Sequence, residues 1–171
     1  MLDLLFRIWK RFNGSLQWRL LWLVNSKYMV SVSGVVQDDA GEVLLQRHRH
    51  WIPDVWGLPG GIVRSGERLE DAFAREVLEE TGLVISDIKL LRVVSGYNMR
   101  LEAYFCSRLK GIGTEQNLRL QAQEVLEARF FPVNALPADM LELQREVILT
   151  GVDHGCVYGN SSETSSTEFS R

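Results

Sequence analysis

The spacing of hydrophobic and polar positions changes several times along the chain, and each change predicts an element. Runs rich in Val and other β-formers, bounded by turn residues, predict strands at 28–37, 43–47, 88–94, 101–108 and 128–131. Helical spacing predicts a helix of about four turns that ends near Thr81-Gly82, and a last amphipathic helix at 138–150 with Gly151 as its stop. Strands and helices mixed in this order predict an α/β fold, with helices covering the faces of one sheet.

The first 27 residues differ from the rest of the chain. Leu5, Ile8, Trp9 and Phe12 stand at helical spacing, and Asn13-Gly14-Ser15 interrupts the stripe. This segment carries five basic residues and one acidic residue, a balance of +4, while the remaining residues balance at −7. Basic residues break its apolar runs, so neither a secretory signal nor a transmembrane helix is expected. We expect an amphipathic arm that packs on its own domain or on a second subunit in a homodimer; peripheral attachment to an anionic membrane is the less favoured alternative.

Length and composition limit the function classes. A chain of 171 residues suits one domain with a modest core. The net charge of −3 argues against a nucleic-acid duplex as partner. Two cysteines without C-x-x-C spacing exclude a zinc ribbon and make a reducing, cytoplasmic setting the default. The expected organisation is a basic aromatic arm at 1–27, a folded domain at 28–151 and a disordered Ser/Thr-rich tail at 152–171.

The helix that ends near Thr81 carries an unusual carboxylate pattern. Its apolar stripe is formed by Leu69, Ala72, Phe73 and Val77. On a helical wheel Glu76, Glu79 and Glu80 continue this stripe, whereas an ordinary surface helix would place them opposite it. Their mutual repulsion and the helix dipole both disfavour this arrangement, and a divalent cation would offset it. Carboxylate oxygens point to Mg²⁺ or Mn²⁺. The alternative is a solvated acidic helix end.

The segment Gly61–Leu83 resembles the Nudix box, G-x₅-E-x₇-R-E-U-x-E-E-x-G-U, in which U is a bulky aliphatic residue. The matching positions are Gly61, Glu67, Arg75, Glu76, Val77, Glu79, Glu80, Gly82 and Leu83. The resemblance implies a Nudix-type α/β/α sandwich with a mixed sheet, and binding of Mg²⁺ (or Mn²⁺) by the box. Metal ligands implied by it are the Gly61 carbonyl and the carboxylates of Glu76, Glu79 and Glu80. It also implies that Glu67 and Arg75 form a salt-bridged frame, and that the catalytic base is a box glutamate such as Glu79 or the later Glu124.

Substrate contacts are expected just before the box. Arg47, His48 and Arg49 belong to the densest basic cluster of the domain, and arginine suits phosphate oxygens because its fork bonds two at once. Candidates for stacking on a nucleobase are Trp51, Trp56, Tyr28 and Tyr97. Packing in the core or on the surface is the favoured role of each. No subfamily signature downstream of the box identifies the substrate.

The resemblance to the Nudix box implies a Mg²⁺-dependent hydrolase of the diphosphate linkage in a nucleoside-diphosphate-X or nucleoside triphosphate. Metal ions on two phosphates polarise the phosphorus–oxygen bonds, and positioning supplies much of the rate. The alternative is a catalytically silent Nudix-fold sensor or interaction module. The complete set of box carboxylates argues against that alternative.

Overall fold

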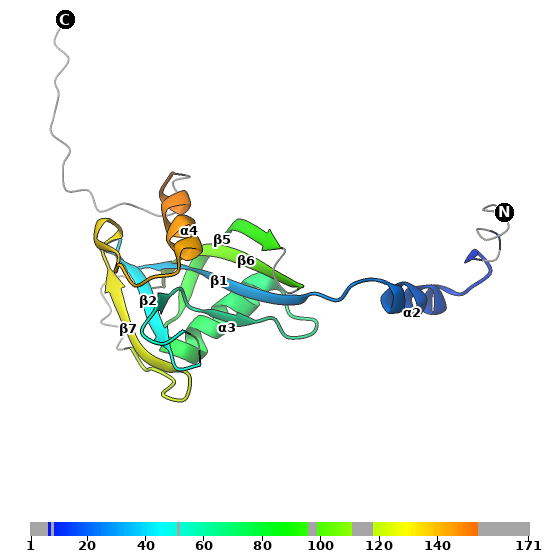
Figure 1. The fold of residues 1–171 in the computed structure, drawn as a ribbon, viewed down its shortest axis with the longest axis horizontal. Coiled ribbons are helices and arrows are strands. Elements are labelled where there is room, and N and C mark those ends of the chain that lie inside the picture. Colours follow the sequence, from blue (N-terminus) through cyan, green and yellow to red (C-terminus); the bar gives the residue numbers. More distant parts are fainter. Residues whose placement is uncertain (1–6, 8, 51, 96–98, 111–117, 154–171) are drawn as a thin grey trace, which may run out of the picture.

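A computed structural model of the chain describes residues 7, 9–50, 52–95, 99–110 and 118–153. Its helices are α2 (Gly14–Val24), α3 (Leu69–Thr81) and α4 (Glu142–Asp153), with a short 3₁₀ helix η1 at Val133–Ala135. Its strands are β1 (Met29–Gln37), β2 (Val43–His48), β3 (Trp56–Gly57), β4 (Gly60–Ile62), β5 (Ile85–Ser95), β6 (Arg100–Leu109) and β7 (Val125–Phe131). Figure 1 shows these strands between α3 and α4, with α2 set apart from them.

The strands form one seven-stranded mixed sheet, with β1 at its centre. Strand β1 runs parallel to β6 over its whole length, from Met29↔Arg100 to Gln37↔Arg108, and β5 is antiparallel to β6. The other edge of β1 is shared by two strands. β4 pairs with its Ser31–Ser33 segment, and β2 pairs with its end at Gln37↔Val43. The sheet therefore opens between β2 and β4, and side chains from α3 reach this opening.

Alternation along the strands divides the interior into two cores. Odd positions of β6, such as Phe105, pack toward α3, where the Phe73 and Phe105 rings stack with centroids 5.6 Å apart. Even positions, such as Tyr104, pack toward α4 with Val147 and Ile148. Helices thus cover both faces of the sheet, so the predicted α/β/α sandwich with a mixed sheet is confirmed.

The predicted elements are present, and the structure corrects several bounds. β5 begins at Ile85 and β7 at Val125, earlier than predicted, and β3 and β4 were not predicted. The prediction that Gly151 stops the last helix is wrong, because α4 continues to Asp153. Val152 packs against the core on that face, and this packing outweighs the low helix propensity of glycine. A disordered tail was predicted for residues 152–171. Residues 152 and 153 belong to α4, and residues 154–171 lie outside the described part of the chain.

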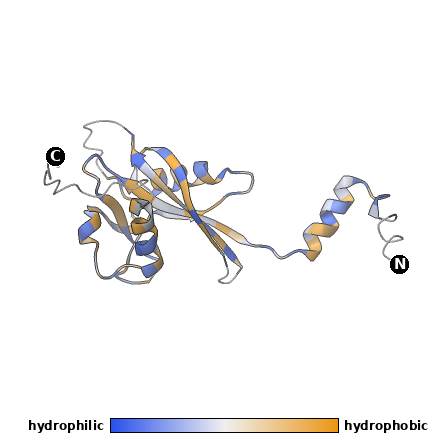
Figure 2. Cartoon of the chain, turned by 90° about the horizontal axis from the view of Figure 1, so that it is seen from above, coloured by the Kyte–Doolittle hydropathy of each residue, from blue (hydrophilic) through white to orange (hydrophobic). Residues whose placement is uncertain are grey.

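Helix α2 lies within the predicted arm. The Asn13 side chain caps it by accepting a hydrogen bond from the Leu16 N–H, and none of its residues is buried. Figure 2 shows a helix with both hydrophobic and hydrophilic residues that stands apart from the sheet, so α2 does not pack on its own domain. Within the described ranges, no helix combines the length and apolar content that crossing a membrane requires.

Candidate active site

Helix α3 carries the box carboxylates, and its sequence sets where it lies and where it ends. Ala72, Phe73 and Val77 are buried against the sheet and fix the rotation of the helix. Gly82 ends it in the left-handed region at φ 75°, where glycine is not strained. Because the stripe continues into the third turn, Glu80 is buried as well, at 1% exposure. The predicted continuation of the apolar stripe by a carboxylate is therefore seen.

Glu80 is held by neutral donors from two strands. Its Oε2 accepts hydrogen bonds from Gln46 Nε2 on β2 at 2.8 Å and from the Gly60 N–H on β4 at 3.1 Å. Its Oε1 lies 3.5 Å from His48 Nε2. A buried carboxylate without a cationic partner on Oε2 is costly, and a metal ion beside it would offset that cost. Oε1 faces His48 and Glu124.

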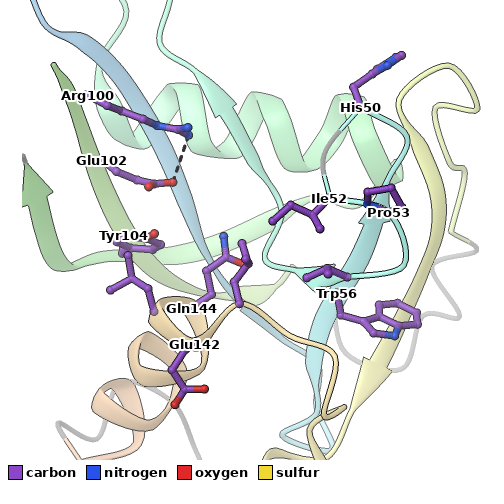
Figure 3. Close-up of a pocket in the computed structure, with 12 residues that line it drawn as sticks. His50, Ile52, Pro53, Trp56, Arg100, Glu102, Tyr104, Glu142 and Gln144 are labelled. Atoms are coloured by element: carbon purple, nitrogen blue, oxygen red, sulfur yellow. Dashed lines mark hydrogen bonds and ion pairs between the residues drawn. The ribbon is translucent and has the colours of Figure 1, made fainter. Parts of the chain in front are cut away.

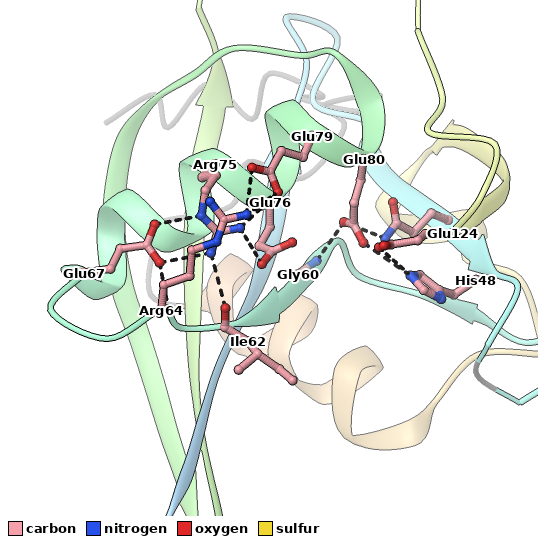
Figure 4. A network of polar contacts seen from close by, with 11 residues as sticks. His48, Gly60, Ile62, Arg64, Glu67, Arg75, Glu76, Glu79, Glu80 and Glu124 are labelled. Carbon is pink, nitrogen blue, oxygen red and sulfur yellow. Dashed lines mark hydrogen bonds and ion pairs between the residues drawn. The ribbon is translucent and has the colours of Figure 1, made fainter.

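His48, Glu80 and Glu124 converge from three segments. One ligand atom from each lies within 4.8 Å of the others, and His48 Nε2 is 3.9 Å from Glu124 Oε2. Backbone bonds hold Glu124 here: the Gln121 N–H donates to the Glu80 carbonyl at 3.0 Å, and the Arg49 N–H donates to the Glu124 carbonyl at 2.7 Å. Figure 4 shows the His48 ring pointing toward both carboxylates. Glu124, which was predicted as a candidate base, thus lies beside Glu80. His48, which was predicted to contact phosphate, lies between these two carboxylates.

Glu76 lies directly against Gly61. A Cβ at residue 61 would stand 2.4 Å from Glu76 Cδ and 2.5 Å from its Oε1, so the absence of a side chain there makes room for the carboxylate. Burial raises the pKa of Glu76, and Arg75, whose Nη1 donates to Oε1 at 2.7 Å, opposes the shift. Gly61 and Glu76 line the same pocket as Glu80 and Glu124, a cavity of about 310 Å³, which we call the metal pocket because its oxygen donors suit a divalent cation.

Arg75 forms the predicted frame. It donates to Glu67 through Nε at 2.7 Å and Nη2 at 3.0 Å, and to the Ile62 carbonyl at 3.2 Å. These hydrogen bonds lower the pKa of Glu67 to about 2, with the Arg75 bond as the largest cause. Glu67 also accepts from the Arg64 N–H, so this network fixes the loop between β4 and α3.

Glu79 has a different environment from its box neighbours. It is 41% exposed and is paired with Arg75 Nη1 at 3.1 Å and with Arg64 Nη2 at 3.1 Å. Figure 4 shows it beside the two arginines, whereas Glu80 points toward His48. Within the described chain, Glu79 is not among the residues that line the metal pocket. Glu79 therefore pairs with the arginines of the frame and does not line the pocket.

The predicted substrate residues separate in the structure. Arg47 forms ion pairs with Asp139 at 3.0 Å and Glu127 at 3.7 Å, and its guanidinium lies over the Trp56 ring. Arg49 donates to the Ala122 carbonyl at 3.2 Å on the exposed side of a loop. Trp56 is buried and lines a second pocket. The predictions for Trp51 and Tyr97 lie outside the described residues, and Tyr28 is exposed on the surface.

Sequence reasoning missed this second pocket. Its volume is about 680 Å³, and it shares Arg100 and Glu102 with the metal pocket. Arg100, Glu102 and Tyr104 alternate on β6, which is a signal in the sequence, but only the pairing of β6 with β1 shows which site they face.

The donor set fits a hard divalent cation. Carboxylate oxygens of Glu76, Glu80 and Glu124 and the backbone at Gly61 border one pocket, and oxygen donors suit Mg²⁺ and Mn²⁺. His48 adds a nitrogen donor that Mn²⁺ accepts more readily than Mg²⁺.

Comparison with known families identifies this architecture. The sequence model of the NUDIX domain matches residues 27–150. The chain belongs to the Nudix family. The match includes the box, the metal pocket and both faces of the sheet.

Curated relatives agree with this membership. The Nudix chain is 34% identical over 111 residues to an ADP-ribose pyrophosphatase of Methanocaldococcus jannaschii, covering 63% of this chain and 64% of that protein. It is 31% identical over 123 residues to a putative nudix hydrolase 1 of Caenorhabditis elegans, covering 71% of this chain and 32% of that protein. It is 30% identical over 88 residues to an 8-oxo-dGTP diphosphatase of Buchnera aphidicola, covering 50% of this chain and 68% of that protein. The chain spans between about a third and two thirds of the first relatives it matches.

Solved structures share the fold. A MutT NUDIX hydrolase from Burkholderia pseudomallei matches with a TM-score of 0.61 at 23% identity, covering 71% of this Nudix chain and 96% of that one. A UDP-X diphosphatase matches with a TM-score of 0.61 at 21% identity, covering 87% and 74%.

Proposed function

We propose that this Nudix protein hydrolyses the diphosphate linkage of a nucleoside-diphosphate-X or nucleoside triphosphate, using Mg²⁺ or Mn²⁺. The observation that carries the proposal is the buried Glu80 carboxylate, which neutral donors hold on one oxygen and which faces His48 and Glu124 with the other. A purely structural helix end would not bury an anion in this way. Relatives named as pyrophosphatases and diphosphatases support the same reaction class.

The residues have distinct roles in this reaction. Glu76, Glu80 and the Gly61 carbonyl would hold the cation, which would polarise phosphoryl oxygens and lower the pKa of a bound water. Arg75 fixes Glu67 and Glu76 on either side of the box loop. Arg100 places a permanent positive charge at the wall of the pocket, where it neutralises phosphate oxygens.

Glu124 is the proposed general base. It is 46% exposed and its carboxylate faces the pocket, so a water molecule can reach it. Glu79 is instead paired with Arg75 and Arg64, and it is not among the described residues that line the pocket. Water attacks phosphorus, its proton passes to Glu124, and the bridging oxygen leaves with the second phosphate. The products are a nucleoside monophosphate and a phosphorylated second moiety.

The test is a Mg²⁺-dependent hydrolysis screen over ADP-ribose, sugar nucleotides including UDP-sugars, 8-oxo-dGTP, dinucleoside polyphosphates and CDP-alcohols. Glu80→Gln should keep the fold, because the amide oxygen still accepts from Gln46 and Gly60, and should reduce turnover by orders of magnitude. Glu70→Gln, on the exposed first turn of α3, is the matched control. Near-normal turnover of Glu80→Gln, or turnover that survives exhaustive chelation, contradicts the proposal. Tight nucleotide binding with no turnover on any substrate would point to a sensor instead.

A further inference from the structure

Helix α2 exposes apolar side chains on nearly every side. Seven of its eleven residues are large and apolar, and their exposed fractions run from 36% at Leu20 to 77% at Val24. At about 100° per residue, Trp18 and Leu20 point in nearly opposite directions. In a globular protein, a helix that is hydrophobic all round is a buried helix. Helix α2 is therefore a helix whose partner surface is not supplied by its own domain.

A membrane surface does not match this helix. A helix that lies in the plane of a membrane keeps one strongly charged face toward water and one apolar face toward lipid. The single charged residue of α2 is Arg19, and Trp22 and Leu23 flank it on the helical wheel. Because α2 lacks a charged face, a protein surface that encloses the helix is the better match.

The C-terminal end of α2 forms a hollow that suits an apolar side chain. Its volume is about 210 Å³, and it is lined by Trp18, Leu21, Trp22 and the linker Asn25–Lys27. The Lys27 ammonium lies 4.6 Å from the centroid of the Trp22 ring and donates a hydrogen bond to the Leu23 carbonyl at 3.1 Å. These contacts hold the linker against the helix, so the hollow is formed before any partner binds.

The folded domain exposes an apolar patch at the point where the arm leaves it. We call it the root patch; its members are Tyr28, Met29, Ile62 and Met99, which are 46% to 57% exposed. The Met29 N–H donates to the Met99 carbonyl at 2.9 Å, and Ile62 pairs with Ser31, two residues further along β1. The four side chains therefore surround one end of the sheet. A group of exposed apolar residues of this kind marks an interaction site.

The arm of the same chain does not cover the root patch. Figure 1 shows α2 standing away from the sheet. Asn25 ends the helix in an extended conformation, with φ −86° and ψ 150°, and the linker Asn25–Lys27 spans at most about 10 Å. A second copy, related by a twofold axis near this linker, would bring its own α2 to the patch. The same operation would place this α2 on the patch of the second copy, which makes the contact isologous.

Charge complementarity also favours a second copy of this chain. The arm has a balance of +4 and the rest of the chain a balance of −7. Four carboxylates lie in the metal pocket beside the root patch, those of Glu76, Glu80, Glu102 and Glu124. A basic arm is attracted to this region, and it separates two folded domains that would otherwise repel each other. The described lining of the larger cavity, drawn in Figure 3, contains no residue of the root patch, so the contact uses a different surface.

We propose that two copies of this chain exchange their arms, so that α2 of each copy packs on the root patch of the other. Trp18 and Trp22 are the central contacts, because large aromatic side chains dominate interface energies. Met29 and Ile62 belong both to the root patch and to the lining of the metal pocket. The arm of the second copy therefore also covers one side of the mouth of that pocket. The exchange does not depend on the proposed reaction.

Sedimentation equilibrium of the full chain tests the contact, with thermal melting to verify that each variant folds. The wild type should be a dimer at micromolar concentration. The arm variant, Trp18→Ser with Trp22→Ser, should raise the dimer dissociation constant about thirtyfold or more. The root variant, Tyr28→Ser with Met99→Ser, should raise it by a similar factor.

The matched control replaces exposed apolar residues elsewhere on the sheet. Leu90 and Val93 on β5 are exposed to the same degree as the root patch. Leu90→Ser with Val93→Ser should leave the dissociation constant of the dimer unchanged.

A mixture of the arm and root variants distinguishes exchange from other arrangements. In a mixed dimer, the intact arm of the root variant meets the intact patch of the arm variant, so one of the two contacts is restored. An equimolar mixture should therefore contain more dimer than either variant alone at the same total concentration. If α2 paired with α2 of the other copy instead, the root variant would remain a dimer and mixing would add nothing.

Four results would overturn the proposal. They are a monomeric wild type, a root variant that stays dimeric, a control variant that becomes monomeric, and a wild type that sediments as a monomer on phosphatidylserine vesicles. Glu80→Gln should remain a dimer whether or not it hydrolyses any substrate. A failure of the proposed reaction is thereby distinguished from a failure of the arm exchange.

Discussion

The contact between Gly61 and Glu76 gives the most discriminating test of the metal pocket. In Gly61→Ala the new methyl group would stand 2.4 Å from Glu76 Cδ, 2.5 Å from Oε1 and 2.7 Å from Oε2. All three atoms belong to the end of one flexible side chain, so the backbone at 61 can stay in place while the carboxylate moves. The substitution therefore displaces a proposed metal ligand without disturbing the core.

The expected size of the effect follows from that geometry. Ordinary van der Waals contact begins at 3.4 Å, so the carboxylate must shift by about 1 Å, and a misplacement of this size costs about a hundredfold in rate. Stability should change little. Gly34→Ala is the contrasting variant, because its methyl group meets the Phe105 carbonyl oxygen at 2.5 Å and the Phe73 ring at 2.7 Å. Overpacking of this kind costs about 1–3 kcal/mol.

The assay combines three measurements on the same preparations. Electron paramagnetic resonance of free Mn²⁺ gives the metal affinity, hydrolysis of the substrate found in the screen gives kcat, and calorimetry gives Tm. Gly61→Ala should lose metal affinity and kcat at nearly wild-type Tm, while Gly34→Ala should lose several degrees of Tm. The double variant Gly61→Ala with Glu76→Asp should recover part of the activity, because the shorter side chain leaves room for the methyl group.

Two outcomes would refute the reasoning. Wild-type Mn²⁺ affinity and kcat in Gly61→Ala would show that Glu76 is not a ligand in the position described. A loss of Tm as large as that of Gly34→Ala would show that the methyl group disturbs the backbone and not the carboxylate alone.

Three further predictions address the arginine frame, the metal and the arm. Because the pKa of Glu67 is lowered to about 2 from 4.5, the stability it contributes is present above pH 4.5 and is lost as the pH falls toward 2. Glu67→Gln should therefore flatten the fall of the urea midpoint between those pH values, and an unchanged slope would contradict the frame. Mg²⁺ or Mn²⁺ at a hundred times its Kd should raise the free energy of unfolding by about 2.7 kcal/mol, which calorimetry detects as a higher Tm. Glu80→Gln should show a smaller rise in Tm. Equal rises in both proteins would exclude Glu80 as a ligand. Deletion of residues 1–27 should change the particle in light scattering from a dimer to a monomer, because α2 buries none of its side chains on its own domain. Unchanged mass together with lost sedimentation on anionic liposomes would assign the arm to a membrane.

Features determined by local sequence could be predicted. The stripe of Ala72, Phe73 and Val77 is a property of one helix, so the wheel also places Glu80 on the buried side. Gly82 ends α3 because a left-handed residue is needed there. The Arg75 frame joins residues of a single loop and helix, and the box resemblance implied it.

Features determined by distant pairing could not be predicted. Arg47 was expected to meet phosphate, but the fold brings Asp139 to it from the segment before α4. The strands β3 and β4 have two and three residues, too few for a periodic signal. Arg100 and Glu102 reach the site because β6 lies parallel to β1, a contact that no local pattern encodes. His48 was expected on phosphate, and its place beside Glu80 depends on the opening between β2 and β4.

The parallel pairing of β1 with β6 also orders the assembly of the molecule in time. β1 is synthesised early, yet its full-length partner ends at Leu109. At about 5–20 residues per second, several seconds pass on the ribosome before that partner emerges. During this interval β1 can pair only with the short β4 and with one residue of β2. The arrival of the β5–β6 hairpin therefore completes the pairing of β1 and, in the same step, sets Arg100 and Glu102 beside the carboxylates of α3.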